Sequence, residues 1–364
     1  MTQTRTRVVL TNPSAWPYVR RGSETLMVGL ARWLNGTGHS AEILAGGPRS
    51  ERYELEGIPV RLVRHPDLRR VHPKLSSDLL LIPGLTAELR RRRGSLVHSF
   101  LYVDAAAARL AGRPYVISYG GIALARSFEG RSAHRRAFLF ASSGARAIIC
   151  PSEASARHLR MTFGLAALVV PNGLDTERFA LDTPRIPDLI FCAATPDDTR
   201  KRIEVLVDAF GIVASQRPGA ELVLAGTASP DTRASLSGRL EPRVAGRLKF
   251  LGDLDAAEVA EWNARASVAC LPSLNEAFGL VVLEALAAGT PVVGASSGGI
   301  PEIVDSHVGA LFIPDDAAGC AAALLEVMAR AADPATSTAC RQRARQYDWQ
   351  VVGPRLVNLY QQLM

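Results

Sequence analysis

The pattern of apolar and polar positions along the chain predicts an α/β protein. Short apolar runs rich in Val, Ile and Leu alternate with longer segments in which apolar residues recur at helical spacing. In the first half, strands are expected at residues 7–12, 40–46, 94–101, 114–121 and 145–152. The amphipathic segment 23–38 between the first two predicts a helix with Ser23 as its N-cap. Apolar strands separated by helices are typical of a parallel sheet covered on both faces.

A second series of the same kind follows the stretch "LVVPNGLDTERF" (168–179). Its expected strands are residues 188–194, 220–226, 246–254, 267–273, 291–296 and 309–314, and its expected helices include 202–216 and 257–266. Asn172-Gly173 and the Pro-rich segment 181–188 mark the boundary between the two series. The sequence therefore predicts two Rossmann-like, doubly wound domains, 1–171 and 188–345, joined by a linker at 172–187. We expect them to face each other across a cleft, with ligands at the carboxyl ends of the strands.

Length and composition agree with two globular domains and exclude several classes of protein. The chain has 364 residues, of which 48% are apolar and 21% charged. No stretch resembles a membrane helix, and the N-terminal apolar run is too short for a signal peptide. The five cysteines form no CxxC pair and the seven histidines show no ligand spacing, so neither disulfides nor a metal is expected. The sequence favours a cytoplasmic protein.

Charge is distributed unevenly along the chain. Residues 1–185 contain 27 Lys and Arg against 14 Asp and Glu, whereas residues 186–364 contain 15 against 21. A basic N-terminal half indicates an anionic partner or peripheral contact with an anionic membrane. The chain has 39 Arg and only 3 Lys, so a general preference for Arg in the composition explains the basic N-terminal half equally well. The basic run "LRRRRG" (89–94) lacks interleaved aromatic residues, which argues against nucleic acid as the partner.

The segment 267–289, "SVACLPSLNEAFGLVVLEALAAG", carries the candidate chemistry. It predicts a strand, a loop and a helix that begins at about Phe278. A helix N-terminus offers free backbone N–H groups to a phosphate, and Gly279 lets the ligand approach closely. Glu276 lies in the loop, and Glu284 is the single charge on an apolar helix, where a carboxylate would suit a ribose diol. The structural alternative is that Glu276 only complements the helix dipole and that Glu284 pairs with an arginine. The spacing of the two favours function, because a buried lone carboxylate is costly.

With Glu276 and Glu284 at E-x7-E spacing, "PSLNEAFGLVVLEALAAGTPVV" resembles the signature of the retaining GT-B glycosyltransferases of the GT4 family. Further stretches resemble other parts of that family: "RRGSETLMVGLARWLNGTGHSAEIL", "CPSEASARHL", "VVPNGLDTERF", "DDTRKRIEVLVDAF", "GGIPEIV", "VGALFIPDD" and "YDWQVVGPRLVNLY". The resemblance covers nearly the whole chain and is more specific in its C-terminal half. It implies a GT-B fold whose C-terminal helix, 346–364, crosses back to the N-terminal domain.

The resemblance also implies an activity and its site. A nucleoside diphosphate sugar, UDP-linked in the first instance, would bind the C-terminal domain and an acceptor the N-terminal one, with no metal or other cofactor and with retention at the anomeric carbon. The implied catalytic residues are Glu276, which binds sugar hydroxyls, and Lys201, which neutralises the departing diphosphate. The full donor set is Gly22, Arg200, Lys201, Arg202, Asn275, Phe278, Gly279, Leu280 and Glu284. The acceptor-side candidates are Ser23, His98, Tyr119 and Gly120.

The chain departs from the family pattern at three places. Pro196 stands where the family has an arginine, and either Arg200 or Arg202 would take over its charge. Arg21-Gly22 replaces a Gly-Gly pair. Gly120-Gly121 replaces a His-Gly pair, so that Tyr119 or His98 would substitute for the sugar-contacting histidine.

The sequence thus favours a hexosyltransferase. A sugar-nucleotide epimerase and a catalytically inactive nucleotide-sugar-binding protein of the same fold are the alternatives. The absence of G-x-G-x-x-G and of G-K-[ST] argues against dinucleotide and P-loop enzymes. A lipid-linked acceptor and a soluble small molecule both remain compatible with the N-terminal half.

Overall fold

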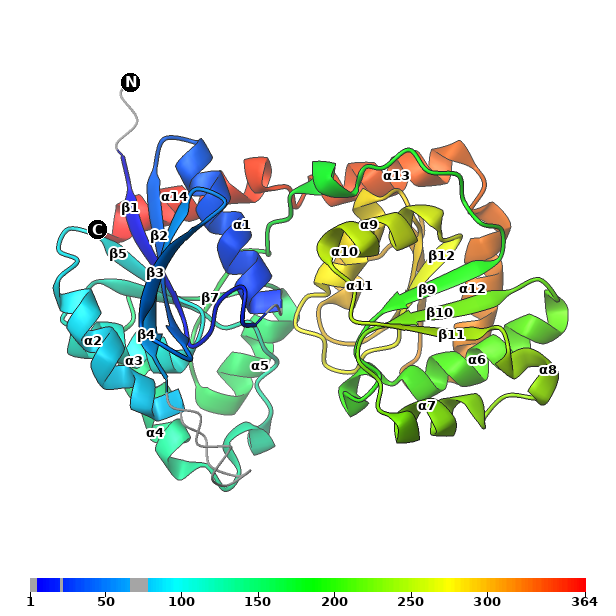
Figure 1. The fold of residues 1–364 in the computed structure, drawn as a ribbon, viewed down its shortest axis with the longest axis horizontal. Helices are drawn as coiled ribbons and strands as arrows, with labels where there is room; N and C mark the ends of the chain where they lie inside the picture. Colours follow the sequence, from blue (N-terminus) through cyan, green and yellow to red (C-terminus); the bar gives the residue numbers. More distant parts are fainter. Residues whose placement is uncertain (1–4, 20–21, 66–77) are drawn as a thin grey trace. The chain divides into compact units, whose positions relative to one another are not determined.

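The computed structural model describes residues 5–19, 22–65 and 78–364, which form two compact units. The first unit comprises the chain up to Gly173 together with Trp349–Met364, and the second comprises Leu174–Asp348. Each unit is built around one sheet with helices on both faces (Figure 1). The segment expected as a linker, 172–187, is thus mostly included in the second unit.

The first unit has an eight-stranded sheet in the order β3-β4-β2-β1-β5-β6-β7-β8. The strands are β1 (Arg7–Asn12), β2 (Ser40–Gly47), β3 (Glu51–Leu55), β4 (Ile58–Arg64), β5 (Leu96–Ser99), β6 (Tyr115–Ser118), β7 (Ala147–Cys150) and β8 (Leu168–Val169). All neighbours are parallel except β3 and β4, which form an antiparallel hairpin at the edge. The sequence analysis missed this hairpin, whose turn is Glu56-Gly57 with both φ angles positive.

Helices cover both faces of this sheet. They are α1 (Gly22–Gly36), α2 (Ile82–Arg90), α3 (Tyr102–Leu110), α4 (Ser132–Gly144), α5 (Glu153–Phe163) and α14 (Trp349–Leu363). Side chains alternate along β1, so that Val8 and Leu10 share a core with α1 and α14, whereas Val9 packs with α2 and α3. The helix α1 begins at Gly22, so the expectation that Ser23 is its N-cap is wrong.

The C-terminal helix α14 is part of the first unit although it follows the whole second unit in sequence. The buried Trp349 packs against Gly29 and Gly173, and Trp33 packs against Gly353. At each of these glycines an added Cβ atom would meet the indole ring. The small residues therefore allow α1 and α14 to approach closely.

The second unit has a six-stranded sheet in the order β11-β10-β9-β12-β13-β14, and all its neighbours are parallel. The strands are β9 (Leu189–Ala193), β10 (Glu221–Ala225), β11 (Leu248–Gly252), β12 (Val268–Leu271), β13 (Val292–Ala295) and β14 (Gly309–Phe312). The helices are α6 (Ile203–Gln216), α7 (Pro230–Ser237), α8 (Pro242–Ala245), α9 (Ala256–Arg265), α10 (Leu280–Ala287), α11 (Ile300–Ile303), α12 (Ala317–Arg330) and α13 (Pro334–Arg345).

Alternation along β9 shows that both faces of this second sheet are buried. Ile190 and Cys192 belong to the large core that includes α6, α10 and α12. Leu189 and Phe191 face the other way, where Phe191 stacks on Trp262 of α9 at 6.1 Å between ring centroids. Every strand and both helices predicted for this half are present, most of the strands shorter by one or two residues at their ends.

All five cysteines are buried and unpaired. In the described ranges, no helix combines the length and the apolar character that a bilayer span requires.

A buried carboxyl group marks the carboxyl end of β1 in the first unit. Asp104 of α3 is fully buried, and its Oδ2 accepts hydrogen bonds from Thr11 Oγ1 at 2.7 Å and from the Phe100 amide at 3.0 Å. Its Oδ1 has no partner among the described residues. Burial raises the pKa of Asp104 to about 8, so the group is mostly protonated at neutral pH.

We expect D104N to remove a pH-dependent loss of stability. A carboxyl group whose folded pKa lies above its unfolded value loses stabilisation as pH rises, here from about 4 to about 8. An amide keeps the acceptor for Thr11 and cannot ionise. The free energy of unfolding of D104N relative to the wild type should therefore rise with pH in this window, by at most about 1.4 kcal/mol per pH unit. Urea unfolding at pH 5, 7 and 9 measures this, and a constant difference across the series would refute the assignment.

Candidate functional site

The candidate site of the second unit starts from the loop between β12 and α10. Gly279 caps α10 in the left-handed region, with φ 102° and ψ 60°, a conformation that favours glycine strongly. The helix begins at Leu280, two residues later than the sequence predicts. The amides of Val282 and Leu283 donate to the Gly279 carbonyl. The amides of Leu280 and Val281 come before the first hydrogen-bonded turn of the helix, so neither has an acceptor within the helix.

Lys201 and Glu276, the two residues predicted to be catalytic, form an ion pair. Lys201 ends the short 3-10 helix Thr199–Lys201, which follows β9, and its Nζ donates to Glu276 Oε2 at 2.7 Å. Both side chains are 22% exposed, so the pair is accessible from solvent. The pairing brings together a cation and a carboxylate that are 75 positions apart in sequence. Both follow strands of the sheet, at their carboxyl ends.

Backbone contacts fix the loop that carries Glu276. The Leu274 amide donates to the Arg200 carbonyl at 2.8 Å, which joins the loops after β9 and β12. The Gly299 amide donates to the Glu276 carbonyl at 2.8 Å. At Gly298 the φ angle is +61°, and an added Cβ atom would overlap the Glu276 backbone. The sequence analysis missed this supporting turn after β13, although the paired glycines of "SSGG" (296–299) could have indicated it.

The two arginines considered as replacements for the missing family arginine differ in their surroundings. Arg200 is 70% exposed and pairs with Asp198 at 2.6 Å, and this hydrogen-bonded partner raises the pKa of Arg200. The Glu276 charge contributes to the same shift, which places Arg200 near the Lys201–Glu276 pair. Arg202 is 31% exposed and pairs with both Glu204 and Asp315. Arg200 is therefore the more available of the two for a ligand.

Glu284 lies in the second turn of α10 with partial solvent access. Burial raises the pKa of its carboxyl group to about 7. In the part of the chain that the structure describes, its carboxylate has no hydrogen-bond or ion-pair partner, so no arginine of that part neutralises it. A partly accessible, unpaired carboxyl group is suited to accept hydroxyl donors of a ligand.

The remaining residues of the predicted donor set differ in their structural surroundings. Asn275 adopts a left-handed conformation with φ 53°, and its amide donates to Ser297 Oγ at 2.9 Å. Phe278 is buried and meets Tyr347 edge to face at 5.7 Å between centroids. The Phe278 side chain is therefore part of the core, which leaves the backbone of Phe278 for contact with a ligand. Gly22 belongs to the first unit, where it is exposed at the start of α1.

His98 is a structural residue, which corrects its selection as an acceptor-side candidate. It is 2% exposed, its Nδ1 lies 2.6 Å from the Tyr360 hydroxyl of α14, and its Nε2 lies 2.6 Å from Ser118 Oγ. Burial lowers the pKa of His98 to about 3, so the imidazole is neutral at physiological pH. Both ring nitrogens are occupied, and none is left for a ligand.

The other acceptor-side candidates lie at the carboxyl edge of the first sheet or at the start of α1. Ser23 Oγ donates to Glu24 at 3.0 Å, and Ser14 also donates to this buried carboxylate at 2.6 Å. The sequence analysis did not single out Glu24. Tyr119 packs against Phe138, and burial raises the pKa of its hydroxyl to about 12. Gly120 is exposed, and a Cβ atom there would meet nothing within 4 Å.

Within the described residues, no three His, Cys, Asp or Glu side chains lie together in a way that could hold a metal ion.

Two family models match consecutive parts of the chain. Residues 20–178 match "Glycosyltransferase Family 4", and residues 186–330 match "Glycosyl transferases group 1". Among curated proteins, a phosphatidyl-myo-inositol mannosyltransferase from Mycolicibacterium smegmatis is 33% identical over 224 residues, or 58% of this chain and 56% of the relative. A glycogen synthase from Mycobacterium tuberculosis is 34% identical over 206 residues, or 54% of this chain and 49% of the relative. The chain thus spans about half the length of the curated relatives that it matches.

Solved structures share the fold over nearly the whole chain. A sucrose-phosphate synthase from Thermosynechococcus elongatus superposes with a TM-score of 0.80, at 20% identity and 99% coverage of both chains. Anabaena HepE in complex with UDP and glucose superposes with a TM-score of 0.77, at 20% identity, with 98% and 99% coverage. At this level of identity the likeness establishes the fold alone.

We expect E284Q to stabilise the protein above pH 7. The folded pKa of Glu284, about 7, exceeds the ordinary value of 4.5, so stability is lost as pH rises between these two values. Removing the charge should raise the melting temperature at pH 8, by roughly 2–4 °C per kcal/mol regained, and change little near pH 4.5. The matched control is E326Q, because Glu326 is exposed on α12 of the same unit. An equal effect of E284Q at both pH values, or the same behaviour in E326Q, would contradict the raised pKa.

Proposed function

Because the chain belongs to the GT4-type glycosyltransferases and has the GT-B fold, we propose that it transfers a sugar from a nucleoside diphosphate sugar to an acceptor hydroxyl. The family and the fold class predicted from the sequence are confirmed by the two consecutive family models and by the solved structures. The observation that carries the proposed activity is the Lys201–Glu276 ion pair, which lies on loops joined at the carboxyl edge of the second sheet.

The proposed donor site assigns one task to each group. Lys201, Arg200 and the amides of Leu280 and Val281 would hold the diphosphate, because they supply positive charge and free N–H donors. Glu284 would accept the ribose hydroxyls. Glu276, already oriented by Lys201, would accept hydroxyls of the donor sugar and hold its anomeric carbon in place. UDP is the first nucleotide to test, since the related HepE structure contains UDP and glucose.

In the proposed reaction the bond from the anomeric carbon to the diphosphate breaks as a bond to the acceptor oxygen forms. The acceptor proton passes to the departing phosphate oxygen, so atoms and charge balance without a metal or a cofactor. Substitution on one face retains the anomeric configuration. Lys201 stabilises the negative charge that develops on the leaving group, and this stabilisation lowers the barrier to transfer.

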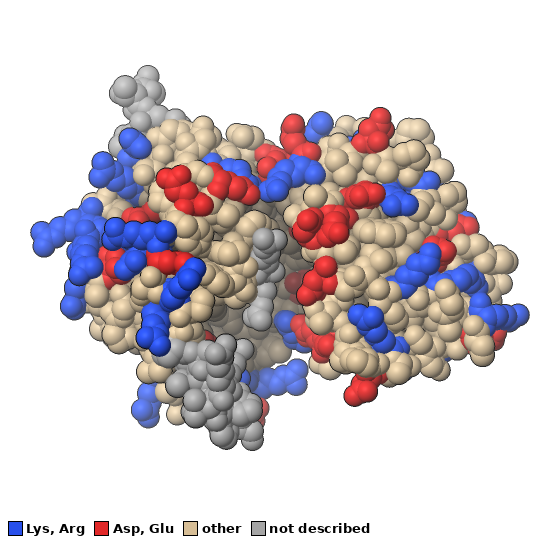
Figure 2. All heavy atoms as spheres, in the orientation of Figure 1, with Lys and Arg blue, Asp and Glu red and all other residues tan. Residues whose placement is uncertain are grey.

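The acceptor is assigned to the first unit on its charge. Lys and Arg side chains gather at the left of the view in Figure 2, over the part of the first unit that carries α2. The basic run after α2 is partly neutralised, because Glu88 pairs with Arg61, Arg91 and Arg92. The remaining positive charge suits an anionic acceptor, either a soluble phosphorylated compound or a lipid at an anionic membrane surface.

E276Q should separate transfer from nucleotide binding. The amide keeps the size of Glu276 but loses its charge, so we expect affinity for the nucleoside diphosphate to change little. Transfer should fall by about 10²-fold or more, as after loss of a transition-state contact. Calorimetry and a transfer assay on one preparation measure both quantities. The matched control is E221Q, because Glu221 also pairs with a lysine, Lys249, at 2.7 Å on the strands β10 and β11. Unchanged transfer by E276Q would contradict the catalytic role of Glu276 and would indicate that its charge only complements the dipole of α10.

K201A should lower kcat strongly and weaken binding of the diphosphate. We expect this effect because, among the described residues, Lys201 is the only lysine beside the N-terminus of α10. The charge of the leaving group develops at this place. We expect a fall in kcat of about 10²-fold or more. K249A removes a lysine from the second Lys–Glu pair and should leave kcat unchanged. Equal turnover of K201A and K249A would mean that another residue neutralises the diphosphate.

A further inference from the structure

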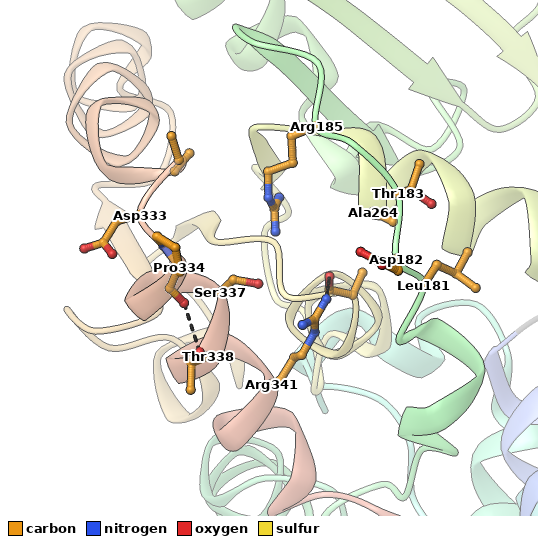
Figure 3. Close-up of a pocket in the computed structure, with 13 residues that line it drawn as sticks. Leu181, Asp182, Thr183, Arg185, Ala264, Asp333, Pro334, Ser337, Thr338 and Arg341 are labelled. Carbon is orange, nitrogen blue, oxygen red and sulfur yellow. Dashed lines mark hydrogen bonds between the residues drawn. The ribbon is translucent and has the colours of Figure 1, made fainter.

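A polar pocket lies in the second unit, beyond the end of α10 that is opposite to Gly279. Its volume is about 310 Å³, at the lower end of the range for small-molecule sites. It is lined by the strand-like segment before β9, by the end of α10 and by one face of α13 (Figure 3). None of its lining residues belongs to the proposed donor site.

Arg185 enters the pocket from the segment before β9. Its guanidinium donates to the carbonyls of Ala266 and Gly289, both at 2.6 Å, and to Thr290 Oγ1 at 2.8 Å. These bonds fix the group, yet no carboxylate of the described residues pairs with it. Burial lowers the pKa of Arg185, and the positive charge of Arg341 adds to that decrease. The charge of Arg185 is thus held in place without a counter-ion.

Arg341 enters from the opposite side, on the face of α13 that also carries Ser337. Its Nη2 lies 3.5 Å from the Ala288 carbonyl at the end of α10, which makes at best a weak bond. Its Nε is buried and has no acceptor within the described ranges. In Figure 3 the guanidinium groups of Arg185 and Arg341 point toward the same space, with the Ser337 hydroxyl between them. Two convergent guanidinium groups therefore face one cavity.

The carboxylates of the pocket do not neutralise this pair. Asp333 caps α13, where its Oδ1 accepts the Ala335 amide at 2.8 Å, and its side chain points away from the cavity (Figure 3). Asp182 is exposed at the rim and forms no ion pair with either arginine. It provides an acceptor at the edge of the cavity.

We propose that this pocket binds the phosphate group of a small phosphorylated polyol. The free terminal guanidinium hydrogens of the two arginines and Ser337 Oγ would donate to the phosphoryl oxygens, and Asp182 would accept a hydroxyl of the organic part. An anion there supplies the missing counter-charge. Because α10 runs from this pocket to Gly279, its ligand contacts one end of the helix whose other end belongs to the proposed donor site.

Calorimetry on the full chain tests the proposal with inorganic phosphate, glucose 6-phosphate and glucose, at constant ionic strength set with chloride. The variant is R341Q, which removes one of the two positive charges and its guanidinium donors. Because Arg341 has no ion pair among the described residues, R341Q should fold with an unchanged or higher melting temperature. R345Q is the matched control, since Arg345 is exposed near the end of the same helix and lies outside the pocket. K201A reports any binding of phosphate at the proposed donor site.

We expect the wild type, R345Q and K201A to bind glucose 6-phosphate and inorganic phosphate, with the sugar phosphate at least as tight, and glucose not to bind. R341Q should weaken the binding of both phosphates by at least about tenfold, because it loses a pair of charge-assisted donors. Equal affinities of R341Q and the wild type would overturn the proposal, as would loss of binding in K201A but not in R341Q. Failure of the wild type to bind both inorganic phosphate and glucose 6-phosphate would also overturn the proposal. None of these three results measures transfer activity.

Discussion

The proposed donor site depends on one constraint, the parallel order of the second sheet. In a parallel sheet all strands end at the same edge, so the loops after β9, β12 and β13 are neighbours however far apart they lie in sequence. Backbone bonds from Leu274 to Arg200 and from Gly299 to Glu276 join these loops. The Lys201–Glu276 ion pair follows from this arrangement. It holds a cation and a carboxylate ready beside the N-terminus of α10, where a leaving anion can be received.

Both candidate sites of the second unit contain charged groups that lack a counter-ion among the described residues. Glu284 has no partner in the described chain, and burial raises its pKa to about 7. The Arg185 and Arg341 charges at the far end of the same helix also lack counter-ions there. Natural proteins satisfy most buried polar groups, because an unpaired one costs free energy. That cost is readily explained where a ligand completes the interactions, with hydroxyls at one end of α10 and a phosphate at the other.

Much of the fold could be predicted from the sequence, because apolar strands and amphipathic helices alternate with clear breaks. The β3–β4 hairpin was missed although Ile58, Val60 and Leu62 of β4 are buried, because the residues of its edge strand β3 alternate only between partly buried and exposed. The start of α10 was placed two residues early, because a left-handed cap at Gly279 cannot be told from a helical glycine by pattern alone. Glu276 was singled out from its position in the loop before an apolar helix and Lys201 through family resemblance, whereas their contact required the tertiary structure. His98 was misassigned, and the burial of the Phe278 side chain was not predicted, because residue type and position in the chain do not reveal burial. The Arg185–Arg341 pocket has no local sequence signal.

The most direct test of the account is the contribution of the second phosphate to nucleotide binding by the wild-type chain. Calorimetry with a nucleoside, its monophosphate and its diphosphate, for the base that binds best, isolates that contribution. The account predicts a gain of at least about tenfold from monophosphate to diphosphate, because only the diphosphate reaches both Lys201 and the free amides of α10. Equal affinities for the monophosphate and the diphosphate would contradict it.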